Sequence, residues 1–301
     1  MFRHSLSFSL LALSLLSTSA FAQPQRLPGF DLQRLQLDPG ALGSFVVGTG
    51  RTLEQGVFRA SFLVHYEQQP LSFDERWDPA AGQSLVEGKF STHLTAAYGV
   101  LPWLQVGAQV PFIFNQSGTR TFTALPPSKT GLGTPWVSAR VGFLSQTRGA
   151  PVNLSLDLAA GVPVGSTEAL ARDDYAAYPR LQLGIRGTGF QVGGEVGALV
   201  RSKVDLGPLS GRENDVMGSE LRVGATVTSL GGRKTRGELS LMTALPLGDG
   251  RMSTEVLLGI RRHALPWLDL YVLGGPGIGI ASDTPSFRVI AGAAFSNAKI
   301  D

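Results

Sequence analysis

The sequence has no cysteine, and beyond its first thirty residues it has no apolar run long enough to form a membrane-spanning helix. The lack of cysteine excludes disulfides, thiolate metal sites and a cysteine nucleophile. A spanning helix needs about 18 or more consecutive apolar residues. If a chain of this kind is held in a membrane, it therefore has to cross it with β-strands.

Charge is scarce as well. Asp, Glu, Lys and Arg make up 16% of the chain, and the formal net charge is +3. Without a run of basic residues, this surplus is too small to predict binding to nucleic acid. Glycine, by contrast, is abundant, with 38 residues. Glycine suits strands that bend and pack closely, as the strands of a small barrel do.

The first 22 residues have the three parts of a secretory signal peptide. Arg3 gives a basic start, residues 10–16 form a short apolar stretch, and Ala20 and Ala22 form a small-x-small cleavage site. Such a segment is removed and does not belong to the fold. The mature chain is therefore expected to be exported, and the cell outer membrane of a Gram-negative bacterium is the expected location of an exported strand-crossing protein.

Apolar and polar side chains alternate through most of the mature chain. In residues 190–204, for example, Phe190, Val192 and Val196 share one parity, while Glu195 has the other. A strand places successive side chains on opposite faces, so this segment has one apolar face and one charged face. No helical segment remains to cover the apolar faces. Lipid outside and water inside are the expected surroundings, which predicts a transmembrane β-barrel.

We predict an all-β, antiparallel transmembrane barrel of about twelve strands over residues 56–296, followed by a tail over 297–301. Short connections alternate with longer ones, and outer-membrane barrels have short periplasmic turns and longer extracellular loops. Both ends of the chain are then expected in the periplasm. The predicted strands span residues 56–67, 85–99, 103–115, 134–146, 151–164, 176–187, 189–204, 218–230, 236–246, 253–262, 267–279 and 286–296.

The parity of each strand assigns its side chains to lipid or to the lumen. Leu183 and Leu258, for example, are expected to face lipid. The charges of opposite parity are of both signs in near balance, and pairing inside a narrow barrel offsets part of their desolvation. The charged residues predicted to face the lumen are Arg59, Glu87, Lys89, Arg140, Asp157, Arg180, Arg186, Glu195, Arg201, Lys203, Glu220, Arg222, Arg261 and Arg288.

Three aromatic residues are expected to have positional roles. The tetrapeptide Leu-Pro-Trp-Leu occurs twice, and Trp103 and Trp267 each open a strand after a short turn. Tryptophan at such places is typical of an interfacial aromatic girdle. Phe295 closes the last strand and resembles the signal that the barrel-assembly machinery reads. The expected partners are therefore outer-membrane lipid and, during insertion, that machinery.

Residues 23–55 precede the barrel and do not form a spanning strand, because Pro39 and the glycines that follow it interrupt them. We hypothesise that this segment is periplasmic, lying across the mouth of the barrel, or is tucked into the lumen. Its place decides whether the lumen is open to solutes.

Several short segments occur in a specific order: Phe-Asp-Leu-Gln-Arg-Leu at 30–35, His-Tyr-Glu at 65–67 and Gly-Leu-Gly-Thr-Pro at 131–135. Together they resemble the N-terminal β-barrel of OmpA-family outer-membrane proteins from myxobacteria, over most of residues 30–296. The resemblance implies an outer-membrane barrel. Many members continue into calcium-type repeats and a domain that binds peptidoglycan. This sequence ends at Asp301, where such repeats would begin, so it is expected to be either a barrel without that anchor or a truncated copy of a longer protein. Peptidoglycan contact is therefore not carried over from the resemblance.

No catalytic residue, metal site or cofactor is predicted. Ser91 and His93 share a strand face, but Ser-x-His is common in strands, and no Gly-x-Ser-x-Gly motif is present. Asp173 and Asp174 are adjacent acids in a predicted loop. They lack the further oxygen ligands that calcium needs, so we expect them to be solvated.

Three functions remain open at this point. The first is an outer-membrane barrel of structural or weakly pore-forming, porin-like type, with selectivity set by the lumen arginines. The second is an outer-membrane transporter of small apolar molecules, which needs an apolar pocket that the charged lumen faces do not favour. The third is a soluble, secreted β-sandwich, which needs a polar outer face. An outer-membrane enzyme is the least favoured reading.

Overall fold

The computed structural model describes residues 26–72, 84–119, 124–207, 215–230, 234–279 and 281–298. The predicted signal peptide, residues 1–22, lies outside these ranges. The regular structure is β, apart from two single 3-10 turns, η1 (Gln146–Arg148) and η2 (Thr167–Ala169). None of the helices in the described ranges is long and apolar enough to cross a membrane.

In the described part of the chain, twelve long strands form the wall, as the sequence predicts, and their bounds differ from the predicted ones by a few residues. Two-residue β4 (Gly131–Leu132) adds to β3, while β9 (Val204–Asp205) and β10 (Val216–Met217) pair with each other. The wall strands are β1 (Phe58–Leu71), β2 (Val86–Leu101), β3 (Leu104–Ser117), β5 (Trp136–Leu144), β6 (Asn153–Gly161), β7 (Ala176–Arg186), β8 (Phe190–Arg201), β11 (Glu220–Ser229), β12 (Thr235–Pro246), β13 (Ser253–Leu265), β14 (Leu268–Gly279) and β15 (Phe287–Ser296).

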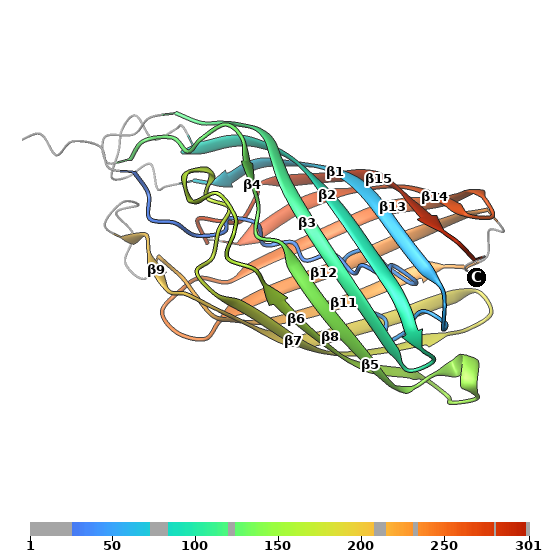
Figure 1. Ribbon diagram of the computed structural model, residues 1–301. Coiled ribbons are helices and arrows are strands. Elements are labelled where there is room, and N and C mark those ends of the chain that lie inside the picture. The colour runs from blue at the N-terminus through green and yellow to red at the C-terminus, as the bar shows by residue number, and fades with distance from the viewer. Residues whose placement is uncertain are drawn as a thin grey trace, which may run out of the picture.

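The sheet closes on itself. Each wall strand pairs antiparallel with the next, and β15 returns to pair with β1, in register from Arg59 opposite Ser296 to Gln68 opposite Phe287. Figure 1 shows the resulting tilted cylinder. Closure removes the open edges of the sheet, so the backbone groups of the wall are satisfied within the ring.

The two ends of the barrel differ in the length of their connections. The turns after β2, β5, β7, β11 and β13 are short, and we call their side the short-turn end. The connections after β1, β3, β6 and β8 are longer and gather at the opposite, long-loop end, together with those after β12 and β14. This alternation agrees with the predicted arrangement of an outer-membrane barrel.

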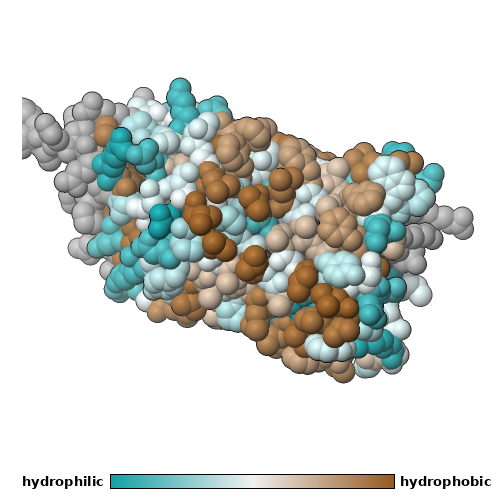
Figure 2. Space-filling model, in the orientation of Figure 1, coloured by the Kyte–Doolittle hydropathy of each residue, from teal (hydrophilic) through white to brown (hydrophobic). Residues whose placement is uncertain are grey.

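The outer face of the cylinder is apolar. Leu183 and Leu258 have 51% and 66% of their surface exposed, and the alternate positions of the other wall strands follow the same pattern. Figure 2 shows hydrophobic residues over the middle of one face and hydrophilic residues gathered at the long-loop end. An apolar band of this kind, with no protein layer on it, is the surface that a barrel presents to lipid. A soluble sandwich is thereby disfavoured.

Most of the described chain before β1, residues 26–57, lies inside the barrel. At the long-loop end, Asp31 forms a β-bridge with Ala171, and at the short-turn end the amide of Gly56 donates to the carbonyl of Gly99. Between these points the segment threads the lumen from one end to the other (Figure 1). We call residues 26–57 the lumen segment. Arg26, the first described residue, lies on the side of the long loops beside Glu168, whereas the barrel itself begins at the short-turn end.

An apolar cluster anchors the middle of the lumen segment. Phe45, Val46 and Val47 are at most 1% exposed, and the ring of Phe45 lies 3.8 Å from that of Tyr271, centroid to centroid. The wall contributes inward-facing Leu63, Leu257, Leu273 and Ile290 to the same cluster. Each fully buried side chain of this size contributes roughly 1.5–3 kcal/mol relative to exposure in water. The segment is therefore held by apolar packing as well as by polar contacts.

Substituting an outward-facing leucine by arginine tests the face assignment. Leu183→Arg places a charge in the apolar band, and we expect a loss of about 2–4 kcal/mol in the free energy of unfolding. Leu183→Phe is the control, because it keeps the face apolar. Urea titration of the refolded barrel in lipid vesicles measures both. Equal stability of the two variants would mean that Leu183 does not face lipid.

The absence of cysteine allows the two ends to be labelled one at a time. We expect Arg26→Cys to react with a membrane-impermeant maleimide in intact cells, because residue 26 lies at the long-loop end. Thr188→Cys, in the short turn between β7 and β8, should react only after the outer membrane is opened. The reverse pattern would show that the long loops face the periplasm.

Candidate functional site in the barrel lumen

Most of the charged residues predicted for the lumen are buried inside the cylinder and paired. Glu67, Glu238, Glu255 and Asp269, which side-chain parity also places on the inward face, are buried there as well. Among the buried inward-facing charges of the wall strands, basic groups outnumber acidic groups by one, so this set of charges is close to neutral. The predicted residues that lie buried in the lumen are Arg59, Lys89, Arg140, Asp157, Arg180, Glu195, Arg201, Glu220, Arg222, Arg261 and Arg288.

Two of the predicted lumen residues lie elsewhere, and a third, Arg186, lies at the short-turn mouth of the lumen beside the lumen segment. Glu87 is exposed at the start of β2, where its carboxylate accepts a hydrogen bond from Thr119 Oγ1 at 2.6 Å. Lys203 follows β8 and pairs with Asp249 at 3.8 Å outside the barrel. Arg186 is only half-buried, at the last residue of β7. Parity fails for Glu87 and Lys203 because it holds only within a regular strand, and both lie at or beyond strand ends.

The predicted aromatic residues lie at the short-turn end. Trp103 and Trp267 are 43% and 47% exposed, in the turns that precede β3 and β14. Phe295 is 43% exposed on β15, with its ring 5.7 Å from that of Trp267. This position suits residues at a lipid–water interface. Their roles as girdle and assembly signal remain predictions.

The wall satisfies much of the backbone of the lumen segment with side chains. Guanidinium groups donate to its carbonyls: Arg201 to Asp31 at 3.1 Å and Arg222 to Arg34 at 2.7 Å. The segment has almost no regular secondary structure, so its buried peptide groups need such partners. These contacts are specific to this path through the barrel.

Side-chain amides and carboxylates accept from the segment's N–H groups. Gln109 accepts from Leu37 at 3.1 Å, and Gln105 accepts from Leu53 at 2.9 Å. Gly48 donates to Glu195 at 2.8 Å, and a Cβ at Gly48 would lie only 2.1 Å from the amide of Gln182. A side chain at residue 48 would therefore have to displace the Gln182 amide, and glycine lets the segment approach the wall this closely.

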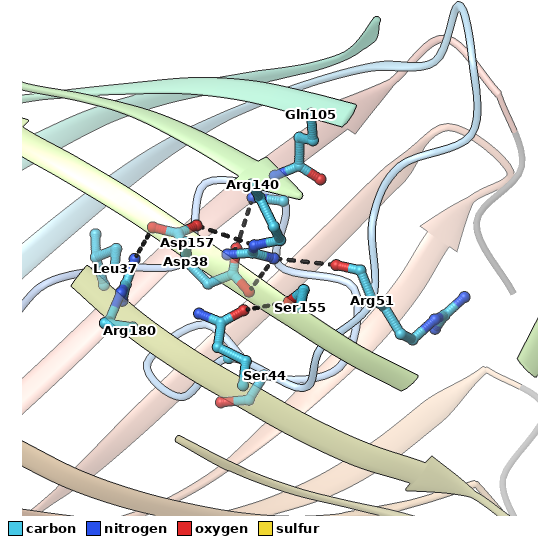
Figure 3. Close-up of polar contacts among 12 residues, drawn as sticks. Leu37, Asp38, Ser44, Arg51, Gln105, Arg140, Ser155, Asp157 and Arg180 are labelled. Atoms are coloured by element: carbon cyan, nitrogen blue, oxygen red, sulfur yellow. Dashed lines mark hydrogen bonds and ion pairs between the residues drawn. The ribbon is translucent and has the colours of Figure 1, made fainter. Parts of the chain in front are cut away.

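The best-defined polar site joins the lumen segment to β5, β6 and β7 (Figure 3). Arg140 on β5 is 1% exposed. Its two terminal nitrogens donate to both carboxylate oxygens of Asp38, Nη1 at 3.1 Å and Nη2 at 2.9 Å. Nη1 also donates to the carbonyl of Arg51 at 3.1 Å, and Nε donates to Asp157 at 2.9 Å. This is a bidentate charge-assisted pair, in which both groups are removed from bulk water.

Asp157 is shared between two arginines. Its other carboxylate oxygen accepts from Arg180 Nη2 at 3.0 Å, so β6 supplies one carboxylate to guanidinium groups on both neighbouring strands. Arg180 Nη1 lies 3.7 Å from Glu195 and makes no hydrogen bond. The wall alone therefore leaves the terminal nitrogens of Arg140 without an acceptor, and the lumen segment provides it.

A second charged contact fixes the segment near the long-loop end. Arg34 pairs with Glu220 at 3.2 Å and with Asp283 at 2.5 Å. Glu220 also accepts from Arg201 and Arg222 on the wall, each at 3.0 Å. The cavity beside this group, lined by Arg34 and Glu255 among others, has a volume of about 40 Å³. That is room for a few water molecules, so the lumen is closed to solutes here.

The histidines do not form a catalytic arrangement. Ser91 Oγ lies 3.4 Å from His65 Nδ1, and Glu67 lies 3.9 Å from His65 Nε2. The guanidinium of Arg288, however, lies 2.7 Å from His65 Nε2. Since an arginine can only donate, Nε2 is an acceptor and cannot also pass a proton to Glu67. A Ser–His–acid relay would need a hydrogen bond from His65 Nε2 to Glu67, and this hydrogen bond is not available.

Acidic residues at the long-loop end are more buried than the sequence suggests. Asp173 is 3% exposed, and its carboxylate accepts from the backbone amide of Asp31 at 3.2 Å. The expectation that Asp173 is solvated is therefore wrong, because the lumen segment covers it. In the described ranges, no group of three or more His, Asp or Glu residues is placed to hold a metal ion.

Comparison with known proteins gives the fold. No protein-family model and no curated protein sequence matches the chain. It is similar to the solved COG4313 outer membrane channel from Pseudomonas putida F1, with a TM-score of 0.62 and 14% identity, covering 87% of this chain and 100% of that one. It is also similar to the NanC porin, with a TM-score of 0.52 and 11% identity, covering 78% and 98%. The chain thus has the fold of outer-membrane barrels, whereas the likeness to myxobacterial OmpA-family proteins gains no support.

The contact between Asp31 and Asp173 predicts a pH-dependent stability. Burial raises the pKa of Asp173 to about 6, with the nearby Asp31 adding to the rise and Arg201 opposing it. The folded carboxyl thus keeps its proton to a higher pH than the unfolded one. This group stabilises the fold at low pH, and its contribution is lost as the pH rises from about 4 to about 6.

Asp173→Asn should therefore flatten the dependence of stability on pH in this range. The measurement is the urea midpoint of the refolded barrel between about pH 4 and about pH 7. Asp174→Asn, at the exposed neighbouring acid, is the control. A pH profile of Asp173→Asn that matches the wild-type profile would contradict the assignment.

Proposed function

We propose that this protein is an outer-membrane channel of porin-like type whose lumen segment closes it. One observation carries the proposal: the ring of twelve strands is complete without residues 26–57, yet these residues fill its lumen. A barrel that needed only to brace the membrane would be served by wall side chains paired with one another. The segment instead satisfies charges that a vacant lumen would present to water and solutes.

The fold and the surface support this reading. The two solved structures named above are described as an outer membrane channel and a porin. The apolar outer band and the division into short turns and long loops are those of an outer-membrane barrel. Location in the outer membrane, export through residues 1–22 and recognition of Phe295 by the assembly machinery all belong to this proposal.

The proposed role is not enzymatic. The geometry at His65 supports this, because Arg288 occupies the ring nitrogen that a relay to Glu67 would use. The proposal includes kinship with the N-terminal barrel of myxobacterial OmpA-family proteins. This kinship is supported only by the short sequence segments named above. It implies a shared barrel, and it does not imply peptidoglycan binding.

Passage of small apolar molecules is the second candidate. The wall residues Leu63, Leu257, Leu273 and Ile290 form an apolar strip inside the lumen, which the segment covers with Phe45 and Val47. If the segment moves, this strip faces the lumen. The strip is a minor part of a largely charged interior, so polar solutes are favoured.

A disulfide lock tests whether the segment closes the channel. Ser44 Oγ on the segment lies 3.4 Å from Ser240 Oγ on β12, so Ser44→Cys and Ser240→Cys together can form a bridge with a small shift. We expect discrete single-channel openings in a planar bilayer under reducing conditions and none after oxidation. Folding is verified first by the heat-modifiable gel shift.

Ser240→Cys alone is the control, and its openings should not depend on the redox state. Openings in both states of the double variant would show that the segment does not close the pore. A folded protein that is silent in both states would instead indicate a membrane brace. An increase in uptake of an apolar dye into vesicles on reduction, without ion conductance, would favour the second candidate.

A further inference from the structure

Arg140 takes its hydrogen-bond acceptors from two sources. The wall supplies one, Asp157, to its Nε. The lumen segment supplies the others, the carboxylate of Asp38 and the carbonyl of Arg51, to its two terminal nitrogens. The part of the guanidinium that faces the lumen therefore depends on the segment alone.

The wall around Arg140 cannot make up for the loss of Asp38. Asp157 already serves both Arg140 and Arg180. Glu195 is the next acid, and it lies against Arg180 on β7. With the segment in place but without the Asp38 carboxylate, the terminal nitrogens of Arg140 have no anionic partner, at a residue that is 1% exposed. A buried charge without its partner is costly, so this site favours an anion in the place of that carboxylate.

The geometry selects a planar anion with two oxygens. Asp38 receives the two terminal nitrogens of Arg140 through two different oxygens, at 3.1 and 2.9 Å. Such a fork matches a carboxylate. Within the segment, Asp38 is held in this position by its own loop, since Gly40 donates to its carboxylate at 2.9 Å and its amide donates to Phe45 at 2.7 Å.

Side-chain amides also face this part of the lumen. Gln105, whose backbone is paired with that of Arg140, and Gln109 on β3 accept from the segment's backbone, and Gln182 on β7 packs against Gly48. An amide both donates and accepts, so these side chains suit hydroxyl groups equally well. The lining thus combines the charges of Arg140, Asp157, Arg180 and Glu195 with uncharged amides.

We propose that Arg140 is a binding site for the carboxylate of a small hydroxylated organic acid, and that Asp38 occupies this site in the closed channel. This inference rests on the proposed function, because the solute reaches Arg140 only when the segment yields. Binding of the solute replaces one charge-assisted pair by an equivalent one, so Arg140 remains paired in both states. The solute and Asp38 compete for the same fork.

Chemical rescue tests the site without requiring conduction. Asp38→Ala in the full chain removes the carboxylate and leaves space of about its size. We expect formate at about ten times its dissociation constant to raise the unfolding temperature of this variant by about 3–5 °C. Asp38→Ala combined with R140Q should show no rise, and wild type should show none either.

The matched control combines Asp38→Ala with R288Q. Arg288 is also a buried lumen arginine, but its partners Glu67, Glu255 and His65 all belong to the wall. This variant should keep the response to formate even if its baseline stability is lower. An absent response in Asp38→Ala, or an equal response with and without Arg140, would overturn the carboxylate site.

Single-channel recording of the wild-type chain then tests the solute. Gluconate, added at about ten times its dissociation constant, should raise the ratio of open to closed time by about tenfold, whereas uncharged sorbitol should not. R140Q should lose this dependence on gluconate, and R288Q should retain it. Equal effects of gluconate and sorbitol would overturn the role of the solute.

The two experiments fail separately. A channel that opens, as in the disulfide-lock experiment, but ignores gluconate supports the proposed function and refutes the inference. A barrel that never opens refutes the proposed function and the role of a solute, while the formate response still decides whether Arg140 binds a carboxylate.

Discussion

The pairing of charges inside a closed ring is the constraint on which the rest of this structure depends. Once β15 joins β1, the inward side chains of every strand share one narrow space with little access to bulk water. A charge in that space is tolerated only with a partner. The wall meets this demand almost completely, through pairs such as Arg288 with Glu255. Arg140 and Glu238 are two places where the wall falls short, and Asp38 and Ser44 of the lumen segment supply partners there.

The same constraint explains how an irregular segment can lie in the middle of a barrel. Residues 26–57 have peptide groups that no ladder satisfies, and the wall has arginines and glutamines whose polar atoms need partners. Each meets the need of the other, as between Arg222 and the carbonyl of Arg34. The apolar packing around Phe45 adds stability to that of the hydrogen bonds between the lumen segment and the wall. The lumen segment is therefore held in the barrel by many individually weak contacts and not by a single strong one.

Such a closure is suited to exchange with solutes. Charge-assisted pairs and amide contacts are formed as well by a polar solute as by a peptide segment, because both present the same kinds of oxygen and N–H groups. In the proposed open state, a solute that forms these polar contacts shifts the equilibrium by as much as its affinities for the two states differ. The apolar contacts of Phe45, Val46 and Val47 are not replaced by a polar solute and favour the closed state.

The sequence by itself determined the strands and their faces, because side-chain parity and the turns between strands are local properties. Twelve strands, the outward leucines and most of the lumen charges could be predicted from it. Parity failed at Glu87 and Lys203, which lie where regular strands end. Only the tertiary structure decided the path of residues 26–57 and the pairing of Asp38 with Arg140, which are 102 positions apart in the chain. An irregular segment has no periodicity to reveal its surroundings, and its partners are set by closure of the ring, which brings distant strands around it.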